Sequence, residues 1–386
     1  MQERITKLFL PEIYMDNAAT SFPKADGVSD AVKQYLDTVG VNVGRSSYAR
    51  CTDAGMTVLS VREQVADTFG CSDLRRVIFT GGCTAALNMA IQGYVRPGDS
   101  VLISSMEHNA VLRPLVALGC RLIRIPSDSD GCMRLDRLNV DWRELRLCVC
   151  TMASNVSGTL QDTEALAALA EKHGVPLVLD AAQAAGHVPI DLKQLHAAAL
   201  CIPAHKGLRG PQGLGLMLLS ESYADALQPS VFGGTGSQSH SDRMPPFLPD
   251  RFEPGTLNLP AIYGLGAAMR SFDPERARVH ELALIRRFLA GVCEIPNIRL
   301  LGPTDPKKRV GVFAIDFLTI DNAEASARLD ESFHILTRCG LHCAPEAHKT
   351  LGSFPQGAVR FSFSPATTAN EIDAALAAIK EISAPS

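Results

Sequence analysis

Three short stretches place chemically capable side chains directly after apolar segments. "VIFTGGCTAALNMA" contains two glycines followed by Cys83 and Thr84, where a helix could begin. Free backbone N–H groups at a helix start, together with a hydroxyl, can bind an anion such as a phosphate. Asp180 ends "VPLVLD", where an unpaired carboxylate would be costly, so it needs a cationic partner or a hydrogen-bonded helix start. Lys206 follows "CIPAH", and a lysine at the rim of an apolar site is suited to Schiff-base chemistry.

Each of these signals also has an ordinary structural explanation. The glycine turn could be a plain strand–turn–helix link, and Asp180 could be a helix N-cap. The glycines after Lys206 do not follow the dinucleotide-binding spacing, which disfavours a nicotinamide site. Taken together, however, a phosphate cradle, a carboxylate for a ring nitrogen and a Schiff-base lysine are what pyridoxal 5'-phosphate requires. The combination therefore predicts a site for that cofactor.

A fourth cluster of reactive side chains lies near the C-terminus, in "TRCGLHCAPEAHKTLGSFPQGAVRFSFSP". Its Cys343 could be a structural thiol, a metal ligand or a nucleophile, and the segment alone leaves all three open. The residue types suit zinc, but there is no paired C-x-x-C and Arg338 would oppose a cation, so we disfavour a metal site. A nucleophilic cysteine needs thiolate character, which His342 or a cationic pocket rim would promote.

The elements that must bring these residues together follow from the pattern between about residues 75 and 220. Short apolar runs alternate there with helical stretches, which predicts a mostly parallel sheet covered by helices on both faces. In such sheets ligands bind at the carboxyl ends of the strands. The expected strands are "RVIFT", "DSVLISS", "CRLIRIP", "LRLCVCTMAS", "VPLVLD", "AALCIPA" and "GLGLMLLS".

The rest of the chain predicts a second, smaller α/β unit. A Gly/Ser/Pro-rich stretch over 232–260 is long enough to be a functional loop. A long helical pattern follows over about 261–294, and then strands near "VGVFAIDF" and "AVRFSFS". The pattern of "NEIDAALAAIKEI" is typical of an amphipathic helix that closes the chain. The fold class is therefore α/β, with a large and a small part.

Composition limits the classes of partner. The chain has 386 residues, a net charge of -4 and 20% charged residues, so it has no basic excess for a nucleic acid. No apolar run approaches the roughly 20 residues of a membrane span, and the N-terminal segment does not resemble a signal peptide. The 11 cysteines have irregular spacing, which argues against a disulfide framework. We expect a cytoplasmic protein with Cys148 and Cys150 packed in its core.

With these motifs in place, the chain resembles the class V aminotransferases of the cysteine desulfurase and selenocysteine lyase family, in particular the group II, SufS-like branch. The resemblance implies fold type I of the pyridoxal-phosphate-dependent transferases, with a large cofactor-binding domain over residues 16–262. A smaller domain over 1–15 and 263–386 would carry the catalytic cysteine loop. The similarity runs through "YMDNAATSFPKA", "SSMEHNAVL", "SNVSGT", "DAAQ", "HKGLRGPQG", "RFEPGTLN", "RCGLHCAP" and "VRFSFSPATT".

The resemblance also implies a role for individual residues. Lys206 would carry the cofactor, His108 would stack on its ring, and Cys343 would take sulfur from L-cysteine as a persulfide and release L-alanine. The other cofactor ligands would be Thr84, Asn155, Asp180, Gln183, His205 and, from the partner subunit of a homodimer, Thr256. The substrate-binding residues would be Asn42, Arg338 and Arg360.

Three positions depart from the family pattern. Pro203 stands where relatives often have a serine that donates to the phosphate, and proline offers neither a hydroxyl nor an N–H. Tyr48 stands where a histidine is frequent, and Cys83 where a second hydroxyl is common. The alternatives therefore stay open. They are a desulfurase that serves an acceptor protein, a lyase acting on L-selenocysteine or releasing sulfide from cysteine, and a low-turnover sulfur-relay or accessory protein.

Overall fold

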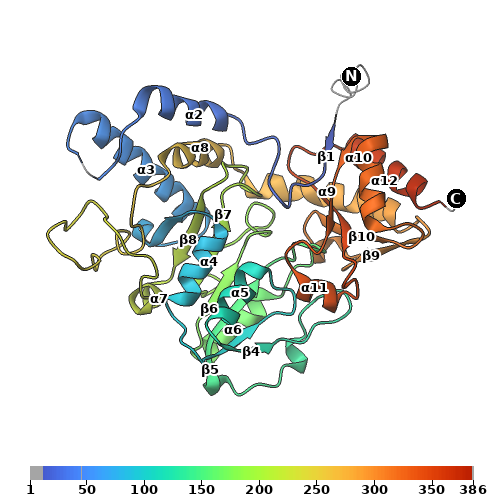
Figure 1. Cartoon of the computed structure of the whole chain (residues 1–386), viewed down its shortest axis with the longest axis horizontal. Coiled ribbons are helices and arrows are strands. Elements are labelled where there is room, and N and C mark those ends of the chain that lie inside the picture. Colours follow the sequence, from blue (N-terminus) through green and yellow to red (C-terminus); the bar gives the residue numbers. More distant parts are fainter. Residues whose placement is uncertain (1–11, 45, 385–386) are drawn as a thin grey trace.

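The computed structural model describes residues 12–44 and 46–384, and a seven-stranded sheet forms the core of its larger unit (Figure 1). The strand order is β2-β8-β7-β6-β5-β3-β4. β8 pairs antiparallel with β2 and β7, and the other neighbours pair in parallel, so six of the seven strands point the same way. The bounds are β2 Val77–Thr80, β3 Ser100–Ile103, β4 Arg121–Arg124, β5 Leu145–Thr151, β6 Leu177–Asp180, β7 Ala199–Pro203 and β8 Gly215–Leu219.

Helices cover both faces of this sheet, because alternate residues of each strand point to opposite faces. Along β5, Cys148 and Cys150 pack into one core, and Leu147 and Val149 pack into the other. The first core contains α3 (Ala49–Thr68), α6 (Thr163–Lys172) and α8 (Leu259–Arg270), and the second contains α4 (Cys83–Gln92), α5 (Asn109–Ala117) and α7 (Glu221–Ala226). The predicted sheet, its strands and the buried cysteines are confirmed.

A smaller antiparallel sheet lies beside the large one, in the order β12-β13-β10-β9 (Figure 1). Three helices pack on it around Phe288, whose ring contacts Phe313, Phe361 and Phe363. The bounds are α9 Pro274–Val292, β9 Ile298–Leu301, β10 Val312–Phe317, α10 Asn322–Phe333, β12 Arg338–Gly340, α11 Pro345–Thr350, β13 Ala358–Ser362 and α12 Ala369–Ile382.

The N-terminal part of the described chain joins both units. β1 (Ile13–Tyr14) pairs with β11 (Ile335–Leu336) of the small unit, and α2 (Val28–Gln34) packs on α8 of the large one. Residues 1–11 of the predicted 1–15 segment lie outside the described residues. The predicted boundary at residue 262 falls inside α8. The division into domains stays a prediction.

The long helix predicted over 261–294 is wrong, because the structure has two helices there. α8 ends at Arg270, and Asp273 caps α9 by accepting from the backbone N–H of Arg276. Pro274 begins α9, a position where the missing N–H of proline costs nothing. The stretch over 232–257 has no helix or strand, as the sequence predicted. Within 12–44 and 46–384, no helix is both long and apolar enough to cross a membrane.

Candidate active site

A cavity of about 210 Å³ opens at the C-terminal ends of β5, β6 and β7, next to the glycine turn that follows β2. This is the carboxyl edge of the parallel strands, where the sequence predicted a ligand. The structure brings seven predicted cofactor residues to its wall, while their individual roles stay predictions. They are Thr84, His108, Asn155, Asp180, Gln183, His205 and Lys206.

The glycine turn before α4 forms one end of the cavity. Gly82 has a φ of 137°, and a Cβ added at Gly81 or Gly82 would meet open space rather than protein atoms. Gly215 at the start of β8 lies directly behind the turn, since its Cβ would stand 2.3 Å from the carbonyl carbon of Gly82. Gly215 therefore packs against one side of the turn, and the other side is open. An anion bound on the open side would face the N-terminus of α4.

Asp180 and Lys206 both line the cavity. The Asp180 side chain is buried, and its Oδ1 accepts from the backbone N–H of Ala182 at 2.9 Å. Burial lowers the pKa of Lys206, while Asp180 acts in the opposite direction. Cys83 lies 3.6 Å from Asp180 Oδ1, and burial followed by the Asp180 charge holds its pKa well above the ordinary value. Its thiol therefore stays protonated and donates to the carboxylate.

A hydrogen-bond chain behind His205 sets the tautomer of this residue. Lys24 Nζ donates to Thr20 Oγ1 at 3.1 Å, and Thr20 Oγ1 lies 3.0 Å from His205 Nδ1. The Thr20 hydroxyl also lies 3.4 Å from the His205 carbonyl, but that carbonyl already accepts from the Ser21 N–H and hydroxyl, so the shorter contact to Nδ1 is the better place for the Thr20 hydrogen. Burial, with Lys206 and Lys24, lowers the pKa of His205 to about 4, so the ring is neutral with its proton on Nε2.

Cys343 lies on the loop between β12 and α11, which is hydrogen-bonded to the cavity-lining Asn155. Its carbonyl accepts from the backbone N–H of Asn109 at 2.9 Å, and Asn155 Nδ2 donates to the carbonyl of His342 at 2.6 Å. The side chain is exposed, so the structural-thiol interpretation is wrong. Among the described residues, no group of three or more His, Cys, Asp or Glu side chains is placed to hold a metal ion.

The cationic neighbour of the Cys343 thiol is Arg338, whose Nη2 lies 3.9 Å from Sγ. The sequence also suggested His342, and this is wrong. The His342 ring is bonded to the Arg338 carbonyl and to His348, and burial lowers its pKa well below the ordinary value. A neutral ring turned away from the thiol cannot stabilise a thiolate, whereas a guanidinium beside it can.

Arg360 is buried between the two units. Its Nη2 pairs with Asp16 Oδ1 at 2.6 Å, and its Nη1 donates to the Asn155 carbonyl at 3.1 Å. Arg338 is its cross-strand partner on β12. Two guanidinium groups on paired strands suit a carboxylate ligand.

Five predicted residues do not line the cavity of a single chain. Arg338, Cys343 and Arg360 lie next to it and contact its lining residues or one another, whereas Asn42 and Thr256 belong to another part of the surface. Asn42 lines a separate hollow between α3 and the 235–257 loop, and Thr256 is exposed on that same loop. Their roles as a substrate ligand and as a contact from a partner subunit stay predictions. Asp16, Thr20 and Lys24 are additional residues that the sequence did not single out. All three lie in "YMDNAATSFPKA", a stretch that contributed to the family resemblance but whose individual positions were given no role.

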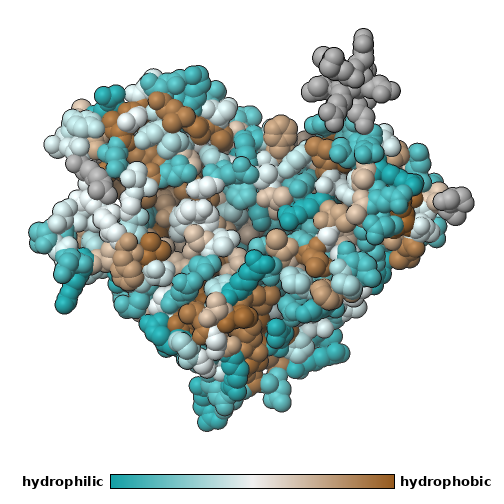
Figure 2. Space-filling view, viewed as in Figure 1, coloured by the Kyte–Doolittle hydropathy of each residue, from teal (hydrophilic) through white to brown (hydrophobic). Residues whose placement is uncertain are grey.

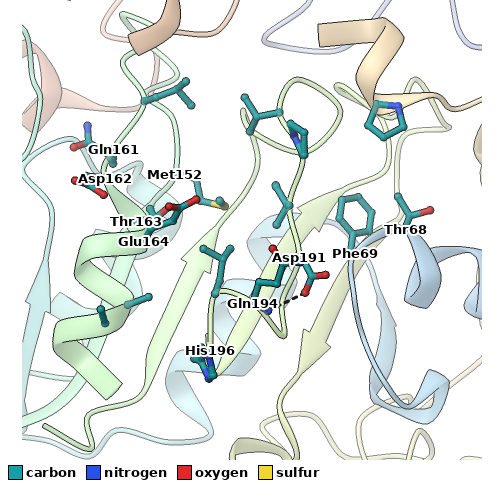
Figure 3. Close-up of a pocket in the computed structure, with 18 of the residues that line it drawn as sticks. Thr68, Phe69, Met152, Gln161, Asp162, Thr163, Glu164, Asp191, Gln194 and His196 are labelled. Atoms are coloured by element: carbon teal, nitrogen blue, oxygen red, sulfur yellow. Dashed lines mark hydrogen bonds between the residues drawn. The ribbon is translucent and has the colours of Figure 1, made fainter. Parts of the chain in front are cut away.

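A larger hollow of about 730 Å³ lies beside α6 and is shown in Figure 3. Several of its polar side chains are engaged within the fold. Asp162 caps α6 at the N–H of Ala165, and Asp191 accepts from the N–H of Gln194. None of the predicted site residues, all of which the structure describes, lines this hollow. The smaller cavity is therefore the better candidate.

The chain is similar to a known protein family over most of its length. The family described as aminotransferase class-V matches residues 13–375. A probable cysteine desulfurase of Methanothermobacter thermautotrophicus is 30% identical, and the match covers 97% of this chain and 96% of the relative. One from Vibrio cholerae is 31% identical, covering 96% and 93%.

Solved structures show the same relationship in three dimensions. The apo structure of cysteine desulfurase from Thermococcus onnurineus has a TM-score of 0.89 at 29% identity, covering 96% of this chain and 94% of that one. The cysteine desulfurase CsdA of Escherichia coli, solved in an S-sulfonic acid form, has a TM-score of 0.84 at 26% identity with the same coverage.

The fold is thus that of the fold type I transferases that use pyridoxal phosphate. Within that class, the chain belongs to the class V aminotransferase family. Its place in the group II, SufS-like branch stays a prediction.

Proposed function

We propose that this protein is a pyridoxal-phosphate-dependent cysteine desulfurase, which converts L-cysteine to L-alanine and takes the sulfur onto Cys343 as a persulfide. The observation that carries the proposal is the place of Cys343. Its thiol is exposed beside Arg338, and the backbone of its loop is bonded to Asn109 and to Asn155, which lines the cavity that also contains Lys206. The printed names of the relatives support the same activity.

The residues around the cavity fit the cofactor. Thr84, the open glycine turn and the Nε2 proton of His205 would hold its phosphate, and Lys206 would bind it covalently. His108 would stack on the ring, Asp180 would pair with the ring nitrogen, and Asn155 and Gln183 would contact the ring hydroxyl. When bound, the cofactor supplies an electron sink next to the substrate α-carbon.

The substrate carboxylate would bind between Arg360 and Arg338. Arg360 Nε has no protein partner among the described residues, so it is available to donate to a ligand. The Asp16 carboxylate already pairs with Nη2, which shows that the guanidinium can bind an anion. A bidentate contact would orient the amino acid with its side chain toward the Cys343 loop. Asn42 is retained as a further substrate contact.

Proton and sulfur transfer can be assigned to residues of this chain. Lys206, whose pKa burial lowers, would remove and return protons at the substrate α- and β-carbons. The Cys343 thiolate would attack the substrate sulfur, so that the carbon–sulfur bond breaks as a sulfur–sulfur bond forms. The electron pair of the broken bond takes up a proton, and L-alanine leaves. The thiol of L-cysteine has then become the outer sulfur of the persulfide.

The test is alanine formation from L-cysteine with dithiothreitol present, comparing wild type with Cys343→Ala. Cys339→Ala is the matched control, because Cys339 packs against the small core. We expect alanine from wild type and the control, at least about 100-fold less from Cys343→Ala, and an unchanged visible absorption of the bound cofactor. If Cys343→Ala keeps its rate, or if wild type makes pyruvate instead of alanine, the proposal is wrong.

Two departures from the family pattern support a second candidate function. Pro203 lines the cavity without a donor, and Cys83 occupies one of the Asp180 hydrogen-bond positions. These features favour slow turnover and hence a sulfur-relay or accessory protein. A selenocysteine lyase is the other alternative, and a large preference for L-selenocysteine in the same assay would identify it.

We further propose a homodimer that works in the cytoplasm and passes its sulfur to an acceptor protein. Exposed apolar side chains occur just after α2, at the start of and within α3, and on the loop that carries Thr256, and Figure 2 shows part of this surface. They are Leu36, Tyr48, Met56, Leu59, Val231 and Phe232. All eleven cysteines are free thiols, as expected in a reducing compartment.

A further inference from the structure

A chain of two imidazoles and one hydroxyl is buried behind the Cys343 loop. His342 Nε2 lies 3.0 Å from the Arg338 carbonyl, His342 Nδ1 lies 3.2 Å from His348 Nε2, and His348 Nδ1 lies 2.7 Å from Ser353 Oγ. Each of the three side chains is at most 3% exposed. The proposed reaction uses neither His348 nor Ser353.

The partners determine where every proton of this chain lies. A carbonyl oxygen can only accept, so His342 carries its proton on Nε2 and leaves Nδ1 as an acceptor. His348 must then donate from Nε2, and its Nδ1 accepts from the Ser353 hydroxyl. All three hydrogen bonds therefore run in one direction, from Ser353 to the Arg338 carbonyl. Both rings are neutral, since burial lowers the pKa of His348 to about 4 and that of His342 well below its ordinary value.

The chain spans a segment of backbone that needs support. His342 and Cys343 have φ angles of 50° and 57°, in the left-handed region that costs non-glycine residues on the order of 1 kcal/mol each. From the cavity side, Asn155 and Asn109 bind the two carbonyls of these residues. The imidazole chain in turn ties α11, which carries His348, to Arg338, the first residue of β12.

We propose that His348 and Ser353 are positioning residues for Cys343. The Ser353 hydroxyl selects the tautomer of His348, His348 orients the ring of His342, and His342 holds the neighbouring cysteine in its left-handed conformation next to the cavity. This inference deepens the proposed function and rests on it for the reaction at Cys343.

The first experiment compares wild type, Ser353→Ala and Ser353→Thr as cofactor-loaded full chains. The alanine variant keeps the backbone hydrogen bonds of residue 353 with His348 and Gly357, and the threonine variant restores the hydroxyl. In Ser353→Ala we expect amide hydrogen exchange over 341–344 to be at least about fivefold faster. We also expect kcat for alanine formation to fall about tenfold while KM changes less than about twofold, because the cavity and Arg360 are untouched. Threonine should restore both values.

Unchanged exchange and kcat in Ser353→Ala, or a loss that threonine does not restore, would overturn the inference. A second measurement uses wild type alone, so it does not depend on whether a variant folds. Nitrogen-15 NMR of histidine-labelled wild type should show both rings as Nε2–H tautomers that do not titrate between about pH 5.5 and 8. A proton on Nδ1 of either ring, or a titration in that range, would contradict the proposed chain.

The two proposals fail in different ways. If wild type forms no alanine, the desulfurase function is wrong, while hydrogen exchange and the tautomers still decide whether Ser353 and His348 hold the loop. If alanine forms but neither exchange nor kcat responds to Ser353→Ala, the function stands and the positioning role is wrong.

Discussion

Burial and local partners set the protonation states of the cavity residues. Burial lowers the pKa of Lys206 and His205 and raises that of Cys83, so each group is driven toward its neutral form. Neutral groups suit this cavity, because a lysine must be unprotonated to act as nucleophile or base. The donors that remain, such as the His205 Nε2–H, are then fixed by hydrogen bonds from outside the cavity.

We predict that Thr20→Val weakens cofactor binding roughly three- to tenfold, the range expected for loss of one hydrogen bond. Without the Thr20 hydroxyl, His205 Nδ1 loses its donor, and the ring is free to place its proton on either nitrogen. Titration of the apoprotein with pyridoxal phosphate, followed by absorbance, gives the affinity. Thr20→Ser keeps the hydroxyl and should bind as wild type does. Equal affinity for the valine and serine variants would show that the Thr20–His205 contact does not matter.

Local sequence patterns were sufficient for some site residues and insufficient for others. Thr84 and Lys206 follow apolar strands and Asp180 ends one, so the pattern alone placed them at one edge of the sheet. The Asp16–Arg360 and Thr20–His205 contacts join residues far apart in the chain, and nothing local indicates which distant partner each will meet. The protons on His342 and His348 likewise depend on packing, which the sequence does not reveal.

At the scale of elements, the apolar runs predicted the strands and the sheet but not every direction. β8 is buried on both faces like its parallel neighbours, so its pattern gave no sign that it runs antiparallel. The reversal has a consequence for the site. It places the first residue of β8, Gly215, at the carboxyl edge of the parallel strands, against the glycine turn.

We predict that Gly215→Ala destabilises the protein by about 1–3 kcal/mol and weakens cofactor binding. The added methyl group would stand 2.3 Å from Gly82 and 2.7 Å from the Cys83 nitrogen, so the turn before α4 must shift. Urea unfolding and cofactor titration measure the two effects. Gly55→Ala is the control, because Gly55 lies within α3 with open space around its Cβ, and alanine there should stabilise by about 0.5–1 kcal/mol. A Gly215→Ala protein with normal affinity would show that the turn does not shape the phosphate site.

For the whole molecule, we predict a loss of stability on acidification, to which His348 contributes. Its pKa is lowered to about 4, whereas an unfolded histidine titrates near 6.5. Between these values the unfolded chain binds more protons, so the free energy of unfolding falls as the pH falls. Glu107 has the opposite effect, because burial raises its pKa to about 8 and its contribution weakens as the pH rises from 4.5. His205 and His342 act in the same direction as His348, so the histidines should dominate.

Urea unfolding at pH 7 and pH 5 checks this prediction. His348→Gln should be less stable than wild type at pH 7, but its loss between the two pH values should be about 1–2 kcal/mol smaller, because glutamine takes up no proton. His196→Gln is the control, since that ring is exposed. Parallel losses in wild type and His348→Gln would mean that His348 titrates normally in the folded protein.

The proposed homodimer gives the last prediction, which concerns Thr256. Thr256 is exposed on the 235–257 loop and lies outside the cavity wall of its own chain, so a contact with the cofactor requires a second copy. We predict that mixing Thr256→Ala with Lys206→Ala raises alanine formation at limiting cofactor above the sum of the two alone. If the two variants pair at random, about a quarter of all sites combine an intact Lys206 from one copy with an intact Thr256 from the other. If Thr256 served its own chain, every intact Lys206 in the mixture would face an alanine at 256, and no gain would appear. A gain therefore requires both association and a site shared between copies, and its absence from a mixture shown by native mass spectrometry to contain mixed dimers would exclude the shared site.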